Sequence, residues 1–244
     1  MSRVEITKLP TGIPGLDDVL GGGLAEYSFN LVAGGPGCGK TTLAHQIMFG
    51  MATADRPALY ITILGEPPIK MLRYQQQFEF FDSAKVNKSV KFLHLGDELL
   101  EHGLETVLAR IVKEIEATSP RLVFVDSFRS LVRKSKEPGQ MELQSFIQHL
   151  ALQLTSWEAT TFLIGEYEDR EGESNPLFTV ADGLIWLSQD TDRNSVVRKV
   201  QVVKMRGQGS TPGVHTMKIS DAGIRIYPRL PNPSGLANLS LIHI

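Results

Sequence analysis

The sequence predicts an α/β fold in which helices cover both faces of a mostly parallel central sheet, with antiparallel strands added at its C-terminal end. Short apolar runs alternate with helical patterns through residues 27–166. A glycine-rich stretch joins the first apolar run to the first helical pattern. From Asp182 onward only strand-like runs follow, separated by turns, which is typical of antiparallel strands that extend the same sheet.

The individual elements follow from the spacing of apolar residues. Buried strands are expected at residues 27–33, 58–64, 90–95, 121–126 and 160–166. Helices are expected between them at residues 40–52, 68–81, 103–117 and 140–159. The later strands are expected at residues 183–189, 195–206, 213–220 and 223–228. We interpret residues 1–229 as one domain and residues 230–244 as a Pro-rich linker or tail, an ending that a truncated chain would also show.

The glycine-rich stretch carries the most informative motif. Gly34, Gly39, Lys40 and Thr41 fill the pattern G-x-x-x-x-G-K-[ST] of the P-loop, with a predicted strand before it and a predicted helix after it. Glycines let backbone N–H groups point at phosphate oxygens, and the helix N-terminus adds a positive dipole end. We therefore expect ATP and Mg²⁺ at this loop and the helical turn after it, held by Gly34, Gly35, Pro36, Gly37, Cys38, Gly39, Lys40, Thr41 and Thr42.

Cys38 occupies a variable position of this loop, so the simplest role for it is a small side chain that fits. Proximity to a helix N-terminus lowers a thiol pKa, which leaves a redox or alkylation switch as the alternative. Cys38 is the single cysteine of the chain, so an intramolecular disulfide is excluded and a reducing cytoplasm is the expected setting.

The composition argues against several classes of protein. The net charge of −2 gives no general attraction to nucleic acid or to a membrane surface. No apolar run is long enough to cross a bilayer, and the N-terminal residues lack the apolar region of a secretory signal. The six histidines show no metal-ligand spacing, so a structural zinc site is not expected.

Two carboxylates at strand ends are candidates for the rest of the site. Asp126 follows the apolar run 122–125, as in a Walker B motif, where the carboxylate holds Mg²⁺ together with Thr41. Glu66 stands just beyond the strand that follows the P-loop helix, at the edge where ligands of open α/β sheets gather. We interpret Glu66 as the general base that prepares water. The alternatives are a helix cap for Asp126 and an exposed loop glutamate for Glu66.

These motifs together resemble one domain of the KaiC family, a branch of the RecA-like P-loop ATPases. The stretches that carry the resemblance are "TGIPGLDDVLGGGL" (11–24), "GGPGCGKTTLAHQ", "YITILGEPP", "VFVDS" and "VVKMRGQ…TMKISDAGIRIYP", over roughly residues 3–229. The resemblance implies an ATPase that assembles into a ring, commonly a hexamer, with ATP between adjacent subunits. The family usually has two adjacent glutamates near "LGEPP", of which this chain matches only Glu66.

The resemblance also implies a role for the sequence "KMR". Side chains alternate in a strand, so Lys204 and Arg206 share one face and Met205 points to the other. In the resembled family this lysine and arginine act on the nucleotide of the next subunit, as arginine fingers do, which makes them catalytic candidates beside Lys40 and Glu66. A solvated basic face is the alternative.

Three classes of function remain open for such a ring. Some clock proteins of this family autophosphorylate on an adjacent Ser-Thr pair, for which this chain has Phe178 and Thr179. We expect no such cycle, and we expect Thr179 to begin a loop-to-strand transition. A DNA motor needs a uniformly positive channel, but the two loops that would line it differ in charge: residues 127–139 are basic and residues 166–175 are acidic. A regulatory ATPase that times the signalling of a protein partner fits better than a motor.

Overall fold

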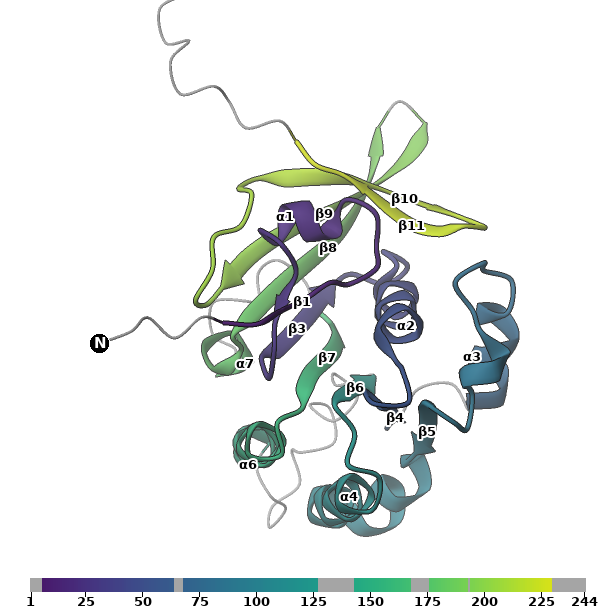
Figure 1. Cartoon of the computed structure of the whole chain (residues 1–244), viewed down its shortest axis with the longest axis vertical. Coiled ribbons are helices and arrows are strands. Elements are labelled where there is room, and N and C mark those ends of the chain that lie inside the picture. Colours follow the sequence, from purple (N-terminus) through teal and green to yellow (C-terminus); the bar gives the residue numbers. More distant parts are fainter. Residues whose placement is uncertain (1–5, 64–67, 127–142, 168–175, 193, 230–244) are drawn as a thin grey trace, which may run out of the picture.

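The computed structural model describes residues 6–63, 68–126, 143–167, 176–192 and 194–229, and one nine-stranded sheet runs through these residues (Figure 1). Its strand order is β11-β10-β9-β8-β3-β7-β6-β4-β5. The strands along the chain are β3 (Phe29–Gly34), β4 (Ala58–Thr62), β5 (Val90–His94), β6 (Leu122–Asp126), β7 (Thr160–Glu166), β8 (Gly183–Asp192), β9 (Ser195–Met205), β10 (Val214–Ser220) and β11 (Gly223–Tyr227). The predicted α/β class is confirmed.

The sheet has a parallel part and an antiparallel part that meet at β8. Strands β3 to β8 pair in parallel with their neighbours, and β8 itself lies parallel to β3. On its other edge β8 pairs antiparallel with β9, and β10 and β11 continue the antiparallel part. The added antiparallel strands are therefore confirmed, although the first of the predicted late strands belongs to both parts.

Two apolar cores cover the two faces of the sheet. On one face α2 (Lys40–Met51) packs against Val32, Tyr60 and Phe124. On the other face α4 (Gly96–Thr118), α6 (Leu143–Ser156) and α7 (Pro176–Val180) cover Leu31 and Val123. Neighbouring residues of one strand thus belong to opposite cores, as the period of two requires. Figure 1 shows α2 on one side of the strands and α6 and α7 on the other.

The N-terminal residues form a small cap on the core that contains α2. They include α1 (Leu16–Val19) and a two-stranded sheet of β1 (Lys8–Leu9) and β2 (Leu24–Ala25). Asp17 Oδ1 accepts hydrogen bonds from the backbone N–H and the hydroxyl of Thr11, at 2.9 and 2.7 Å. No helix within the described ranges is long and apolar enough to cross a membrane.

Several element boundaries differ from the predicted ones. The helix expected over 68–81 ends early: α3 is Pro68–Gln75 and is followed by the 3-10 turn η1 (Ser83–Lys85). Glu79 N–H donates to Asp221 O at 2.9 Å, which ties the chain after α3 to the β10–β11 turn. The helix expected over 103–117 is the second part of α4, which bends at Gly103 with φ of 78°.

Candidate functional site

The loop of residues 34–41 joins the carboxyl end of β3 to α2. A side chain at Gly34 would put its Cβ 2.0 Å from Leu187 O, so only glycine allows β3 to lie this close to β8 there. Gly39 precedes α2 with φ of 103°, a left-handed conformation that favours glycine. Pro36 and Gly37 are exposed, and Gly35 is partly exposed. The predicted strand–loop–helix context of the motif is therefore present.

Lys40 and Thr41, the first residues of α2, face inward from the loop. Lys40 is 9% exposed, and its Nζ donates to Gly35 O at 2.7 Å. The Thr41 hydroxyl donates to Asp126 Oδ2 at 3.0 Å, from the end of β6. The hydroxyl of Tyr60, which is fully buried in β4, donates to the same oxygen at 2.7 Å. The structure thus brings the predicted pair of Thr41 and Asp126 into direct contact.

The environment of Asp126 disfavours the ionised form of its carboxyl group. Burial raises its pKa above the ordinary value, and the bonds from Tyr60 and Thr41 and the charge of Lys40 only partly offset this. The negative charge of Glu166 raises the pKa further. A divalent cation held by Asp126 and Thr41 would relieve this cost, because opposite charge favours an ionised carboxylate. The donor set, a carboxylate and a hydroxyl, suits Mg²⁺.

A cavity of about 520 Å³ opens over these residues. Six of the predicted site residues line it: Gly37, Gly39, Lys40, Thr41, Thr42 and Asp126. Side chains of α3 and of the antiparallel strands complete it, including Met71, Tyr74, Gln75, Arg198 and Ile219. The cavity is therefore shared between the P-loop and elements that are distant from it in the sequence.

Two charged side chains of this cavity are absent from the sequence-based prediction. Glu166 is the last residue of β7 and pairs in register with Gly34, so it lies at the cavity rather than belonging only to an acidic loop. Its place at a strand end is the signal that also identified Asp126. Arg198 lies within β9, and its Nε is buried without a hydrogen-bond partner among the described residues. An unpaired donor beside a cavity fits a ligand with acceptor oxygens or nitrogens.

The lowered thiol pKa that the alternative role of Cys38 as a switch requires is not found. Cys38 is 1% exposed, and burial raises its pKa even though the nearby Lys40 charge lowers it. The Sγ atom lies 3.8 Å from Lys40 Nζ. Loss of hydration outweighs the helix N-terminus here, so the thiol packs inside the loop as a small apolar side chain.

Several predicted features lie outside the described residues. Glu66 falls in residues 64–67, and the basic residues of 127–139 fall in residues 127–142. Most of the acidic segment 166–175 and the tail 230–244 also lie outside them.

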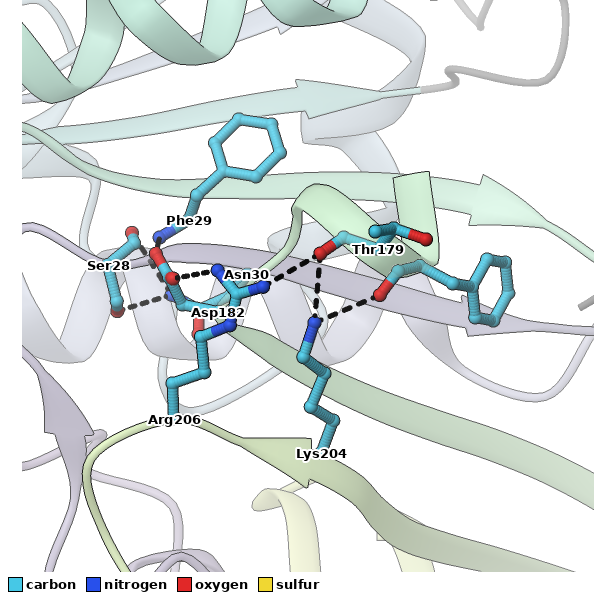
Figure 2. A network of polar contacts seen from close by, with 8 residues as sticks. Ser28, Phe29, Asn30, Thr179, Asp182, Lys204 and Arg206 are labelled. Carbon is cyan, nitrogen blue, oxygen red and sulfur yellow. Dashed lines mark hydrogen bonds and ion pairs between the residues drawn. The ribbon is translucent and has the colours of Figure 1, made fainter. Parts of the chain in front are cut away.

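Lys204 and Arg206 lie far from the P-loop of their own chain. Lys204 Nζ donates to the carbonyl oxygens of Phe178 and Thr179, both at 3.1 Å (Figure 2). Arg206 donates to Thr179 O at 2.9 Å and pairs with Asp182 at 3.2 Å. Both side chains therefore turn toward the same carbonyl, as the predicted alternation requires.

The strand register gives the scale of this separation. Asp182 Oδ2 accepts from the backbone N–H of Phe29, the first residue of β3, whereas the P-loop begins at Gly34, its last residue. Five residue steps along a strand span about 16 Å. The two cations thus lie at the amino end of β3, opposite its P-loop end.

The expectation that Thr179 begins a loop-to-strand transition is wrong. Thr179 lies inside the short helix α7, and β8 starts only at Gly183. The carbonyls of Phe178 and Thr179, near the C-terminal end of this helix, meet the cations of Lys204 and Arg206. Cations are favoured at a helix C-terminus, which is a tertiary reason for a helical turn here.

Known proteins with similar sequences include ATPases of one family. A family model described as "ATPase: KaiC" matches residues 9–231. A UPF0273 protein of Thermotoga maritima is 29% identical over 245 residues, which cover 91% of this chain and 97% of the relative. The DNA repair protein RadA of Mycobacterium tuberculosis is 29% identical over 220 residues, which cover 88% of this chain and 42% of RadA.

The fold is also that of a solved structure. It is the crystal structure of a KaiC-like protein from the hyperthermophilic archaeon Pyrococcus horikoshii. The TM-score is 0.79 at 24% sequence identity, and the match covers 92% of this chain and 100% of that one. The likeness extends over the parallel and the antiparallel parts of the sheet.

Proposed function

Because this chain belongs to the KaiC family of ATPases, we propose that it binds Mg-ATP and hydrolyses it at the subunit interfaces of a homo-oligomeric ring. The observation that carries the proposal is the joint placement of Lys40, Thr41 and Asp126 around one cavity of about 520 Å³. A charged amine, a hydroxyl and a carboxylate are the groups that P-loop enzymes use for a triphosphate and its metal ion.

The binding half of the reaction belongs to this cavity. Lys40 gives up its bond to Gly35 O and places its charge on the outer phosphates. Thr41 and Asp126 hold the metal ion, which when bound neutralises charge that develops on the phosphate oxygens. The buried Nε of Arg198 supports a further contact with the nucleotide from β9.

Hydrolysis needs further groups: one that prepares the attacking water, and cations that come from the adjacent subunit. We propose that Glu66, which follows β4, orients and deprotonates the attacking water. Lys204 and Arg206 stabilise transition-state charge on the nucleotide of the adjacent subunit. Their place at the amino end of β3 supports action between subunits, because the P-loop of the same chain begins at the other end of that strand.

The biological role that fits best is a regulatory ATPase of the cytoplasm, with a protein as its signalling partner. Thr179 is exposed, but its partner position in an autophosphorylating pair is Phe178. We therefore propose no clock-type phosphorylation cycle, and we expect intact-mass spectrometry after incubation with ATP to show no added phosphate.

Native mass spectrometry with and without Mg-ATP tests the central proposal. We expect nucleotide-dependent rings, in which each subunit holds one nucleotide, and slow release of phosphate in a parallel assay. Calorimetry on folded protein that detects no affinity for Mg-ATP would overturn the assignment of the cavity.

A DNA-dependent ATPase is the second candidate, because RadA is a DNA repair protein by name and is similar to 88% of this chain. Filter binding to single-stranded DNA over a salt series, combined with phosphate release, separates the two candidates. Stimulation of turnover by single-stranded DNA at moderate salt would favour the second candidate. We expect no stimulation.

A further inference from the structure

Asp182 forms two hydrogen bonds with Phe29, the first residue of β3, in addition to its contacts with Arg206. Its backbone N–H donates to Phe29 O at 2.7 Å, and its Oδ2 accepts from Phe29 N–H at 3.0 Å. Its carbonyl accepts from the backbone N–H of Arg206 at 2.9 Å. The Asp182 carboxylate is therefore held in place by backbone contacts from β3, which lies in the centre of the sheet.

The second carboxylate oxygen of Asp182 is turned to Arg206. Oδ1 lies 3.2 Å from Nη1, while Nη2 of the same guanidinium donates to Thr179 O at 2.9 Å (Figure 2). Two acceptors, one in α7 and one in the connection between α7 and β8, thus fix the plane of the guanidinium. A guanidinium has five N–H donors, so a side chain held in this way keeps donors for phosphate oxygens.

The negative charge of Asp182 also offsets the repulsion between Lys204 and Arg206, which lie close together. Lys204 donates to Thr179 O, the same carbonyl that Arg206 contacts. Burial lowers the pKa of Lys204, the charge of Arg206 lowers it further, and the carboxylate of Asp182 opposes both effects. Without this negative charge the repulsion between the two cations would not be compensated.

A β-bulge determines which face of the sheet these cations occupy. Ile185 pairs with Val202, but Leu184 pairs with Lys204, so Val203 is an extra residue in β9. An extra residue reverses the alternation of the residues that follow. Lys204 and Arg206 consequently face α7, whereas Val202 faces the core that contains α2.

We propose that Asp182 is the positioning residue for the Lys204–Arg206 pair: it holds the two cations in the orientation in which they reach the nucleotide of a neighbouring subunit. This rests on the action between subunits proposed above. Asp182 contacts the arginine rather than the nucleotide, so its loss should lower turnover without changing the affinity of its own P-loop for ATP.

Mixed rings of two variants test the proposal. Arg206→Ala subunits keep their own cavity but present no guanidinium, and Lys40→Ala subunits present an intact pair to their neighbours. We expect the mixture to turn over ATP. When Lys40→Ala/Asp182→Asn subunits replace the Lys40→Ala subunits, turnover should fall roughly 10- to 100-fold, the range for losing a hydrogen bond to a charged group. Asparagine keeps an oxygen for Phe29 N–H but removes the negative charge.

The matched control is Lys40→Ala/Asp190→Asn. Asp190 pairs with Lys199 at 2.8 Å on the same two strands, β8 and β9, but it is exposed and outside the cavity. These subunits should restore turnover as fully as Lys40→Ala subunits do. Calorimetry should give Asp182→Asn alone an ATP affinity within twofold of the original chain.

The outcomes separate the two proposals. Equal turnover with Lys40→Ala and Lys40→Ala/Asp182→Asn partners would overturn the role of Asp182 and leave action between subunits intact. No turnover with Lys40→Ala partners would overturn action between subunits itself. If the asparagine variant does not enter rings, Lys40→Ala/Asp182→Glu subunits take its place. The carboxylate then moves by one methylene, and we expect at least a roughly tenfold loss; equal turnover again overturns the proposal.

Discussion

The two ends of β3 carry cationic groups that are built in different ways. At the carboxyl end, residues 34–41 form the P-loop from consecutive positions, and Lys40 bonds to Gly35 within the same loop. At the amino end, Lys204 and Arg206 are held by α7, by Asp182 and, through it, by Phe29. The first group depends on local geometry, whereas the second depends on packing between distant segments.

The two groups also differ in exposure. Lys40 is 9% exposed, but the side chain of Arg206 is 55% exposed. A buried ammonium serves a ligand that enters its own cavity. An exposed guanidinium can meet another subunit. This difference supports the proposal that one end of the strand binds the nucleotide and the other end acts on a neighbouring subunit.

Removal of Arg206 should have the largest effect. We expect Arg206→Ala to lower turnover by about 10³-fold or more, because an arginine finger stabilises charge only in the transition state. ATP affinity of the P-loop should stay within twofold of the original. Phosphate release at saturating ATP measures the first quantity, and calorimetry measures the second. A parallel loss of ATP affinity would mean that Arg206 contributes to ATP binding, as Lys40 is proposed to do.

Removal of Lys40 should give the opposite pattern. We expect Lys40→Ala to weaken ATP binding by roughly 100-fold, since a charged hydrogen-bond donor to phosphate is lost. Calorimetry with Mg-ATP checks this, with Lys199→Ala as the control, because Lys199 pairs with Asp190 outside the cavity. Similar affinities of the two variants would argue against the role of the P-loop lysine.

A buried histidine below the P-loop should make stability depend on pH. His45 of α2 is fully buried against Tyr60, and its ring nitrogens lack hydrogen-bond partners among the described residues. Burial lowers its pKa from 6.5 to about 4, which the nearby Gln75 side chain opposes in part. The unfolded chain therefore binds a proton below pH 6.5 that the folded chain does not, and stability falls as pH falls.

From pH 7 to pH 5 this effect lowers the free energy of unfolding by about 2 kcal/mol. The measurement is urea unfolding of the original chain and of His45→Leu at both pH values, and the difference between them isolates His45 from other titrating groups. An equal change in the free energy of unfolding of both proteins would mean that His45 has the same pKa in the folded and the unfolded chain.

Replacement of Cys38 should have the smallest effect. We expect Cys38→Ala to change ATP affinity less than twofold, because the thiol packs in the loop without a strong polar partner. The same thiol should react slowly with a disulfide reagent in the folded chain, and quickly after urea unfolding. Rapid labelling of folded protein, with loss of ATP binding, would restore the idea of a switch.

Local motifs could be predicted because their physics involves neighbours in the chain. The glycines, lysine and threonine of residues 34–41 must lie together, so the pattern already described a loop for phosphates. Asp126 could be predicted because carboxyl ends of parallel strands meet at one edge. Glu166 satisfies the same rule, and its acidic neighbours in the sequence led instead to an interpretation as a pore loop.

Other features depend on contacts that no local pattern contains. The helical turn at Thr179 contacts Lys204 of β9 and Arg206 just after that strand, some 25 residues later. The chain after α3 is joined to the β10–β11 turn by the hydrogen bond from Glu79 N–H to Asp221 O. Arg198 is an ordinary strand residue in the sequence, and only the pairing of β8 with β9 brings it to the cavity.

The amino-acid sequence by itself determined the α/β class, the P-loop and its Asp126 partner, because periodic burial and consecutive glycines act over short distances. The tertiary structure alone decided which face of the sheet Lys204 and Arg206 occupy, through the extra residue Val203, and which contacts hold Arg206 there, through Asp182. The physical reason is that strand register and bulges are set by pairing between strands, and pairing joins residues that are far apart along the chain.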